Sequence, residues 1–244
     1  MTTPERLDQI ARHLADAWRS GRAWTVEQHD ALTPEDSYAI QDRVARLLEW
    51  FPDGHPRAWK AGGNPTLTAA PLARVQASGT TWHLHGVGDI VAEAEISLRL
   101  ARSPRDAQDV HACIGTMCAS IEIVATRMKN GLKAPPAWKT ADQQLHAGSV
   151  MGTEIPFAAR DWKQQRGTLA INGEIKVSFE GTHPNGDPAY PLTWLVDHAR
   201  ARTGALRAGD AIMTGAWALV AANIGDLVEV EFENIGRVSV RLAG

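Results

Sequence analysis

Apolar residues recur at helical spacing in the first fifty residues, and this pattern predicts two helices. The first begins at Thr3-Pro4-Glu5, where Thr is a typical N-cap and Pro suits the first helical position. Thr33-Pro34-Glu35-Asp36 repeats these signals, and Pro52-Asp53-Gly54 ends the second helix. The apolar positions are Leu7, Ile10, Leu14 and Trp18, then Ile40, Val44, Leu47, Leu48 and Phe51. The chain therefore opens with a helical segment, residues 1–60.

From Trp82 onward, short strand-like runs broken by Gly, Pro and Asp predict a β-rich core. Asn172-Gly173 joins two of these runs as a type I′ hairpin would. We expect helices over Val110–Arg127 and Pro191–Thr203 to interrupt the strands. The expected strands are Ile90–Leu100, Thr168–Ile171, Ile175–Phe179, Ala211–Thr214, Leu227–Phe232 and Arg237–Leu242. This order predicts an α+β fold, with a mostly antiparallel sheet in a core of residues 61–244 that is continuous with the helical segment.

Length, charge and cysteine content narrow the class of protein. The 244 residues suit one hydrophobic core, and 25 basic against 28 acidic residues lack the basic excess of a protein that binds nucleic acid or a membrane surface. Cys113 and Cys118 are too few for a disulfide framework, and we expect them on different faces of the predicted helix. Residues 1–15 lack a signal-peptide pattern, and the apolar run Ala211–Ile224 is too short to span a bilayer. The prediction is a reduced, cytoplasmic protein.

Two acids stand out in the predicted strand Ile90–Leu100. Alternation puts Glu93 and Glu95 on one face, opposite Ala92 and Ala94. Two neighbouring carboxylates repel each other unless a cation lies between them, and oxygen ligands suit Mg²⁺ or Mn²⁺. For this pair alone, a solvated charged face on an edge strand is the favoured explanation.

Glu122 shifts the balance toward a metal. It stands between Ile121 and Ile123, where an unpaired carboxylate would be costly. Its partner could be a shared metal ion, or an arginine such as Arg127. Two acids from one strand and a third from another segment would leave half of an octahedron open for a bidentate oxygen substrate.

Lys60 is a candidate for proton transfer. It lies in Trp59-Lys60-Ala61-Gly62-Gly63, where glycines let backbone N–H groups approach an anion closely. A lysine beside a metal and a substrate anion could donate or accept a proton. The alternative is a surface lysine that follows a loop.

These residues resemble the fumarylacetoacetate hydrolase superfamily, in its branch of 2-keto-4-pentenoate hydratases and 4-oxalocrotonate decarboxylases. Four kinds of stretch carry the resemblance: the opening of a helix, the metal-binding acids, a central hairpin and the C-terminal strands. They are Leu32–Gln41; Glu93–Glu95 with Ser120–Val124; Gly167–Glu174; and Leu206–Asp210 with Thr214-Gly215 and Ile224–Asp226.

The resemblance implies a rolled, mixed β-sheet that follows N-terminal helices and carries the active site. It implies Mg²⁺ or Mn²⁺ held by Glu93, Glu95 and Glu122, a small 2-keto acid that chelates this metal, and Lys60 in proton transfer. We expect a metal-dependent lyase working through an enolate, foremost a hydratase of a 2-hydroxy-2,4-dienoate in the catabolism of aromatic compounds. A 4-oxalocrotonate-type decarboxylase is the alternative, followed by C–C hydrolysis and by a catalytically degenerate partner subunit. A homo-oligomer is expected, with a complex with a related pathway enzyme as a further option.

The surroundings of the substrate depart from the family pattern. No Asp or Glu lies between Ala61 and Gly88, where the branch usually has an acid–base aspartate. We therefore consider His55 as a substitute proton carrier, and Asp142 as a partner of the lysine or the metal waters, or as a loop cap. Trp217 stands where the family has a smaller polar residue. The candidate substrate-binding residues are Gly62, Gly63 and Trp217.

Overall fold

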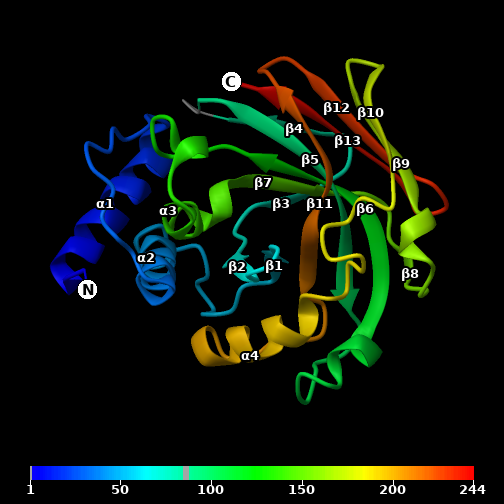
Figure 1. Cartoon of the computed structure of the whole chain (residues 1–244), viewed down its shortest axis with the longest axis horizontal. Helices are drawn as coiled ribbons and strands as arrows, with labels where there is room; N and C mark the ends of the chain where they lie inside the picture. The colour runs from blue at the N-terminus through cyan, green and yellow to red at the C-terminus, as the bar shows by residue number, and fades with distance from the viewer. Residues whose placement is uncertain (1, 85–87) are drawn as a thin grey trace.

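The computed structural model describes residues 2–84 and 88–244. Its four α-helices are α1 (Pro4–Ser20), α2 (Pro34–Leu47), α3 (Pro136–Ala141) and α4 (Leu192–Arg202). The sequence signals at the helix starts are confirmed: the Thr3 hydroxyl accepts from the Arg6 N–H, and Thr33 forms a capping box with Asp36. Helices α1, α2 and α3 gather at one side of the molecule, where they share an apolar cluster (Figure 1).

A curled sheet of eight strands forms the centre of the molecule (Figure 1). Its order is β2-β1-β11-β5-β6-β7-β3, with β8 paired to β6. The strands are β1 (Ala58–Gly62), β2 (Thr68–Pro71), β3 (Val75–Ala77), β5 (Ile90–Leu100), β6 (Ile114–Val124), β7 (His146–Met151), β8 (Ile155–Pro156) and β11 (Ala211–Ala222). The two edge strands, β2 and β3, are neighbours in the chain and are separated by three residues. The sheet is therefore curled so that its two edges lie close together, connected by residues 72–74.

A second sheet of five strands packs against the first. Its order is β10-β9-β12-β13-β4. The strands are β4 (Thr80–His83), β9 (Arg166–Ile171), β10 (Glu174–Glu180), β12 (Leu227–Phe232) and β13 (Gly236–Ala243). The main apolar core takes side chains from both sheets, including Ile96, Ile121 and Val230. The pairs β1–β11, β3–β7 and β4–β13 are parallel and the other pairs antiparallel, which confirms a mixed sheet core behind N-terminal helices.

Most of the predicted elements are confirmed, and one is wrong. Strands β5 and β12 have the predicted bounds, α4 lies inside its predicted range, and Asn172 and Gly173 have the positive φ angles of a type I′ turn. The helix expected over Val110–Arg127 is instead a short 3₁₀ turn, Val110–Cys113, followed by β6. Strand β6 is buried on both faces, so its sequence shows no alternation and imitates a buried helix.

The structure also corrects the expectations for the two cysteines and for the end of the helical segment. Cys113 lies in the 3₁₀ turn and Cys118 in β6, so the two cysteines do not share a helix; both are free and buried. Strand β1 begins at Ala58, before the end of the predicted helical segment, and already contains Lys60. Within the described residues, no helix combines the length and the apolar character needed to cross a membrane.

Candidate active site

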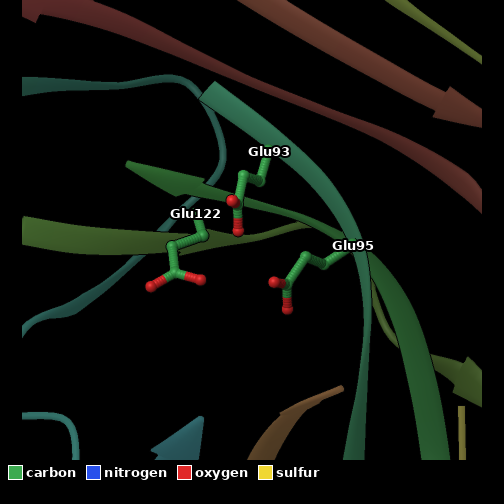
Figure 2. Close-up of side chains that lie close together, drawn as sticks. All are labelled: Glu93, Glu95 and Glu122. Atoms are coloured by element: carbon green, nitrogen blue, oxygen red, sulfur yellow. The ribbon is translucent and has the colours of Figure 1, made fainter. Parts of the chain in front are cut away.

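The register of two neighbouring strands brings three glutamates together. Glu93 of β5 lies directly opposite Glu122 of β6, and Glu95 lies opposite Ser120. Side chains of directly paired residues stand on the same face of a sheet, so all three carboxylates share one face. Figure 2 shows them pointing toward one another. One oxygen from each carboxylate lies within 4.8 Å of the others.

Burial makes this cluster of acids energetically unusual. Glu95 and Glu122 are fully buried, and Glu93 is partly exposed. Burial raises the pKa of Glu93 to about 7, with the charge of Glu122 adding to the effect and Lys60 opposing it. Burial and the charge of Glu122 also raise the pKa of Glu95 well above its ordinary value. The site as it stands therefore lacks enough positive charge to keep all three carboxylates ionised.

Glu122 is the glutamate with the strongest partners. Its Oε2 lies 2.6 Å from the ammonium of Lys60, and its Oε1 is 3.1 Å from Nδ1 of His146. Burial opposes ionisation of Glu122, but Lys60 and His146 outweigh it and hold the pKa of this carboxyl at about 2. The alternative partner considered from the sequence, Arg127, is not the one found.

Lys60 reaches the glutamates from β1. Besides Glu122, its Nζ lies 3.7 Å from Oε2 of Glu93. Burial disfavours the charged ammonium, but the three glutamates outweigh burial and raise the pKa of Lys60, so this side chain is protonated. Lys60 is therefore part of a buried ionic cluster, and the alternative of a surface lysine is wrong.

The glutamates fit a divalent cation. The Gly215 N–H donates to Oε2 of Glu95 at 3.2 Å, whereas Oε1 of Glu95 is buried and accepts no hydrogen bond from any described residue. An unpaired buried carboxylate oxygen is costly, and a shared cation would satisfy it. Three carboxylates form the oxygen-rich set that Mg²⁺ and Mn²⁺ prefer.

Asp142 is buried near the site but contacts Arg127. The Arg127 Nε donates to Oδ1 of Asp142 at 2.6 Å, and the Thr126 hydroxyl donates to Oδ2 at 3.0 Å. The same arginine donates to the backbone carbonyl of His146 at 2.7 Å. Asp142 therefore supports His146 through Arg127, and no ion pair links it to Lys60 among the described side chains.

The structure does not bring His55 to the glutamates. Its Nε2 lies 3.0 Å from the Asp210 carboxylate, in a buried pair just before β1 and β11 begin. The two strands are parallel, so this pair sits at their start, whereas Lys60 lies further along β1. We therefore interpret the His55–Asp210 pair as a support for the strand starts.

Gly62 and Gly63 lie at the end of β1, beside β11. A Cβ on Gly62 would meet backbone atoms of Thr214 and Gly215 at 3.6 Å. Gly63 has a φ of +119°, and a Cβ there would lie 2.2 Å from the Thr66 carbonyl oxygen. Gly63 therefore requires glycine, whereas a side chain at Gly62 would make only ordinary van der Waals contacts with β11.

Trp217 occupies a different environment. It packs with Trp162, Phe179, Phe232 and the His183 ring, at centroid distances of 5.3–6.3 Å, in the core between the two sheets. The glutamates lie on the other face of the curled sheet. The structure thus places this predicted substrate-binding residue among core aromatics.

Two residues of β7 outside the set of predicted site residues lie beside Glu122. His146 contacts Glu122, and Ser149 lies directly opposite Glu122 in the register of β6 and β7. His146 Nε2 and Ser149 Oγ are buried and have no hydrogen-bond partner among the described residues. Their relation to Glu122 could not be predicted from local sequence, because it depends on the pairing of β6 with β7, and both residues lie 24 residues or more from Glu122 in the chain.

Comparisons with known proteins agree with this geometry. The model of the fumarylacetoacetate (FAA) hydrolase C-terminal family matches residues 42–243. A 2-hydroxyhexa-2,4-dienoate hydratase of Comamonas testosteroni is 25% identical over 264 residues, which cover 99% of each protein.

Two solved structures show the same fold. The 4-oxalocrotonate decarboxylase from Pseudomonas putida G7, complexed with magnesium and adipate, superposes with a TM-score of 0.85 at 23% identity, over 99% of each chain. The fumarylpyruvate hydrolase from Pseudomonas aeruginosa, in complex with Mn²⁺ and pyruvate, superposes with a TM-score of 0.56 at 15% identity, over 77% of this chain and 89% of that one.

Proposed function

The chain belongs to the fumarylacetoacetate hydrolase family, and from this premise we propose that it is a metal-dependent lyase acting on a 2-keto acid through an enolate. The foremost reaction is hydration of a 2-hydroxy-2,4-dienoate, as in the aromatic catabolism that the sequence resemblance implies. The observation that carries the proposal is the buried cluster of Glu93, Glu95 and Glu122 beside a protonated Lys60.

The three glutamates are the proposed ligands of Mg²⁺ or Mn²⁺. Such a dication, when bound, supplies positive charge at the carboxylate and C2 oxygens of a 2-keto acid and so lowers the energy of its enolate. His146 orients the Glu122 carboxylate through Nδ1, and the Gly215 N–H orients that of Glu95.

Lys60 is the proposed proton donor. Its ammonium is held by Glu122 and faces the same space as the other two carboxylates, and a positioned acid can protonate a carbon of an enolate. Gly62 and Gly63, at the end of the strand that carries Lys60, are proposed substrate-binding residues. Asp142 acts at a distance, by holding Arg127 against the His146 carbonyl.

Decarboxylation of a 4-oxalocrotonate-like acid is the second candidate. It is supported by the likeness of the whole fold to a 4-oxalocrotonate decarboxylase. Release of CO₂ from the substrate would distinguish decarboxylation from hydration. A degenerate partner subunit is the third reading, favoured by the lack of an acid between Ala61 and Gly88, and turnover by the isolated chain would exclude it.

The test separates metal binding from catalysis. Calorimetric titration of the metal-free protein with Mg²⁺ and with Mn²⁺ measures binding, and loss of dienoate absorbance measures hydration. We expect both signals to disappear in Glu95→Gln and to persist in Glu229→Gln, a half-buried glutamate of β12 in the other sheet. A wild-type protein that binds neither ion would overturn the proposal. A cytoplasmic location, a homo-oligomer and a complex with a related enzyme stay predictions.

A further inference from the structure

The space around the glutamates is closed on one side. Beyond Glu95, the same face of the curled sheet carries an apolar cluster to which Cys118, Met151 and Met213 contribute. The other members are Ala58, Ala70, Leu72 and Ala211, all buried. A molecule held at the carboxylates therefore cannot extend in this direction.

On the other side of Glu93, the same face carries apolar residues that include an exposed leucine. Leu219 of β11 lies directly opposite Glu93, and Ala221 lies opposite Val91, which in turn lies opposite Val124. Because paired residues share a face, these four side chains, here named the apolar rim, stand on the face of the glutamates. Leu219 is 60% exposed, an unusual state for a leucine next to a buried ionic cluster.

The arginines near this part of the fold are engaged elsewhere. Arg127 is buried and saturated by Asp142 and two backbone carbonyls. Arg74 precedes Val75, which packs on the apolar cluster, so alternation turns Arg74 to the other face, where its guanidinium lies 4.8 Å from the Trp82 ring.

Three other basic residues belong to other parts of the fold. Arg57 is exposed and precedes β1, at the end of that strand where His55 lies. Lys133 and Lys139 belong to the segment around α3 that packs on the N-terminal helices. Across residues 2–84 and 88–244, Lys60 is thus the cation that reaches the three carboxylates.

The loop of residues 181–191 contains no lysine or arginine. Asn185 donates to the Gly63 carbonyl at 3.0 Å, and His183 donates through Nε2 to the Thr214 carbonyl at 3.0 Å, which ties this loop over the ends of β1 and β11. Its acidic residue is Asp187. A second carboxylate on a substrate would meet neutral, apolar or like-charged groups here.

From these placements we propose that the substrate tail is short, apolar and uncharged, and that Leu219 is the residue that determines this specificity. The inference rests on the proposed function, since it concerns the far end of a 2-keto acid held at the glutamates. It favours a monocarboxylic acid over a dicarboxylic one. A second carboxylate beside Leu219 would lose its hydration without gaining a hydrogen bond or an ion pair.

The experiment compares two acids of equal length. Calorimetry on the Mg²⁺-loaded protein measures the affinity of 2-oxopentanoate, whose tail is apolar, and of 2-oxoglutarate, whose tail ends in a carboxylate; oxalate reports on the chelating site alone. We expect 2-oxopentanoate to bind at least about tenfold more tightly than 2-oxoglutarate. In Leu219→Arg, this ratio should fall to about one or reverse, because an arginine pairs with the second carboxylate.

Ile175→Arg is the matched control. Ile175 is 59% exposed on β10 of the other sheet, so the variant adds the same charge at an equally exposed site and should keep the wild-type ratio. If oxalate binds but 2-oxoglutarate binds as tightly as 2-oxopentanoate, the inference fails while the proposed function stands. If the ratio survives in Leu219→Arg, the role of Leu219 is wrong. If oxalate does not bind, the proposed function fails, and the inference fails with it.

Discussion

Two of the three glutamates differ in their hydrogen-bond and ion-pair partners, and therefore in their pKa values. Glu122 has Lys60 and His146 and stays ionised, whereas Glu95 has a single backbone N–H and a raised pKa. The difference arises from neighbours on β1 and β7, since both glutamates are fully buried. At the scale of single residues, the groups beside a carboxylate decide whether it can hold a cation.

His146→Ala should weaken the binding of Mg²⁺ about 10- to 100-fold, because Glu122 would lose the donor that orients it. Calorimetric titration measures the affinity, and thermal melting verifies that the variant folds. His111→Ala is the control, since this exposed histidine contacts Thr193 on α4, away from the glutamates. An unchanged affinity in His146→Ala would show that the imidazole does not position Glu122.

Lys60→Met should destabilise the metal-free protein by on the order of 3 kcal/mol, because removal of one partner leaves buried charge uncompensated. Urea unfolding in the presence of a chelator measures this loss. Addition of Mg²⁺ should stabilise the variant more than the wild type, since the added cation replaces the missing ammonium. Equal stabilisation of both proteins would contradict this view of Lys60.

At the scale of elements, the strands that carry the site differ in how well the sequence predicts them. Strand β5 was predicted with its bounds because Glu93 interrupts an apolar run and gives an alternation. The sequence of β6 predicts a helix, since both of its faces are buried and apolar, and no pattern in the sequence predicts β7. A single sequence contains no information about which buried run pairs with which.

Gly148→Ala should disrupt the packing of β7 against the second sheet. A Cβ at this position would lie 1.9 Å from the Trp82 ring, so the indole or the strand must move. We expect a loss of stability of at least about 3 kcal/mol in urea unfolding. Gly173→Ala, where the space is open and only φ is unfavourable, should lose about 1 kcal/mol. The reverse order would show that β7 tolerates displacement.

At the scale of the whole molecule, the family and the fold could be predicted from the sequence, but the surroundings of the site could not. The motif residues Glu93, Glu95 and Glu122 do come together as expected. Asp142 and His55 were assigned by their nearness in sequence or in motif, yet each has a buried partner of its own, Arg127 and Asp210. Such partners come from segments far along the chain, and only the folded structure reveals them.

The contact between α4 and the N-terminal helices should make stability depend on pH. His198 of α4 packs on Trp194 and on Tyr38 of α2, and burial, helped by the charge of Arg202, lowers its pKa to about 4. His198 therefore becomes protonated near pH 6.5 in the unfolded chain, but only near pH 4 in the folded chain. Stability contributed by neutral His198 is complete above about pH 6.5 and is lost as the pH falls toward 4.

Thermal melting at pH 7 and pH 5 measures this dependence. His198→Gln cannot titrate, so its melting temperature should fall less between the two values than that of the wild type. His111→Gln, an exposed histidine, should behave like the wild type. An equal fall in all three proteins would show that His198 does not carry the effect.

The joining of β2 to β3 by residues 72–74 has a consequence for association between chains. The exposed backbone of an edge strand is a template on which another chain can add a strand, and this hazard grows with the length of the edge. The edges of the curled sheet are four and three residues long, whereas β5, β6 and β11, of 11, 11 and 12 residues, are paired on both sides. The strands that carry the three glutamates, β5 and β6, thus have no exposed backbone edge on which another chain could add a strand.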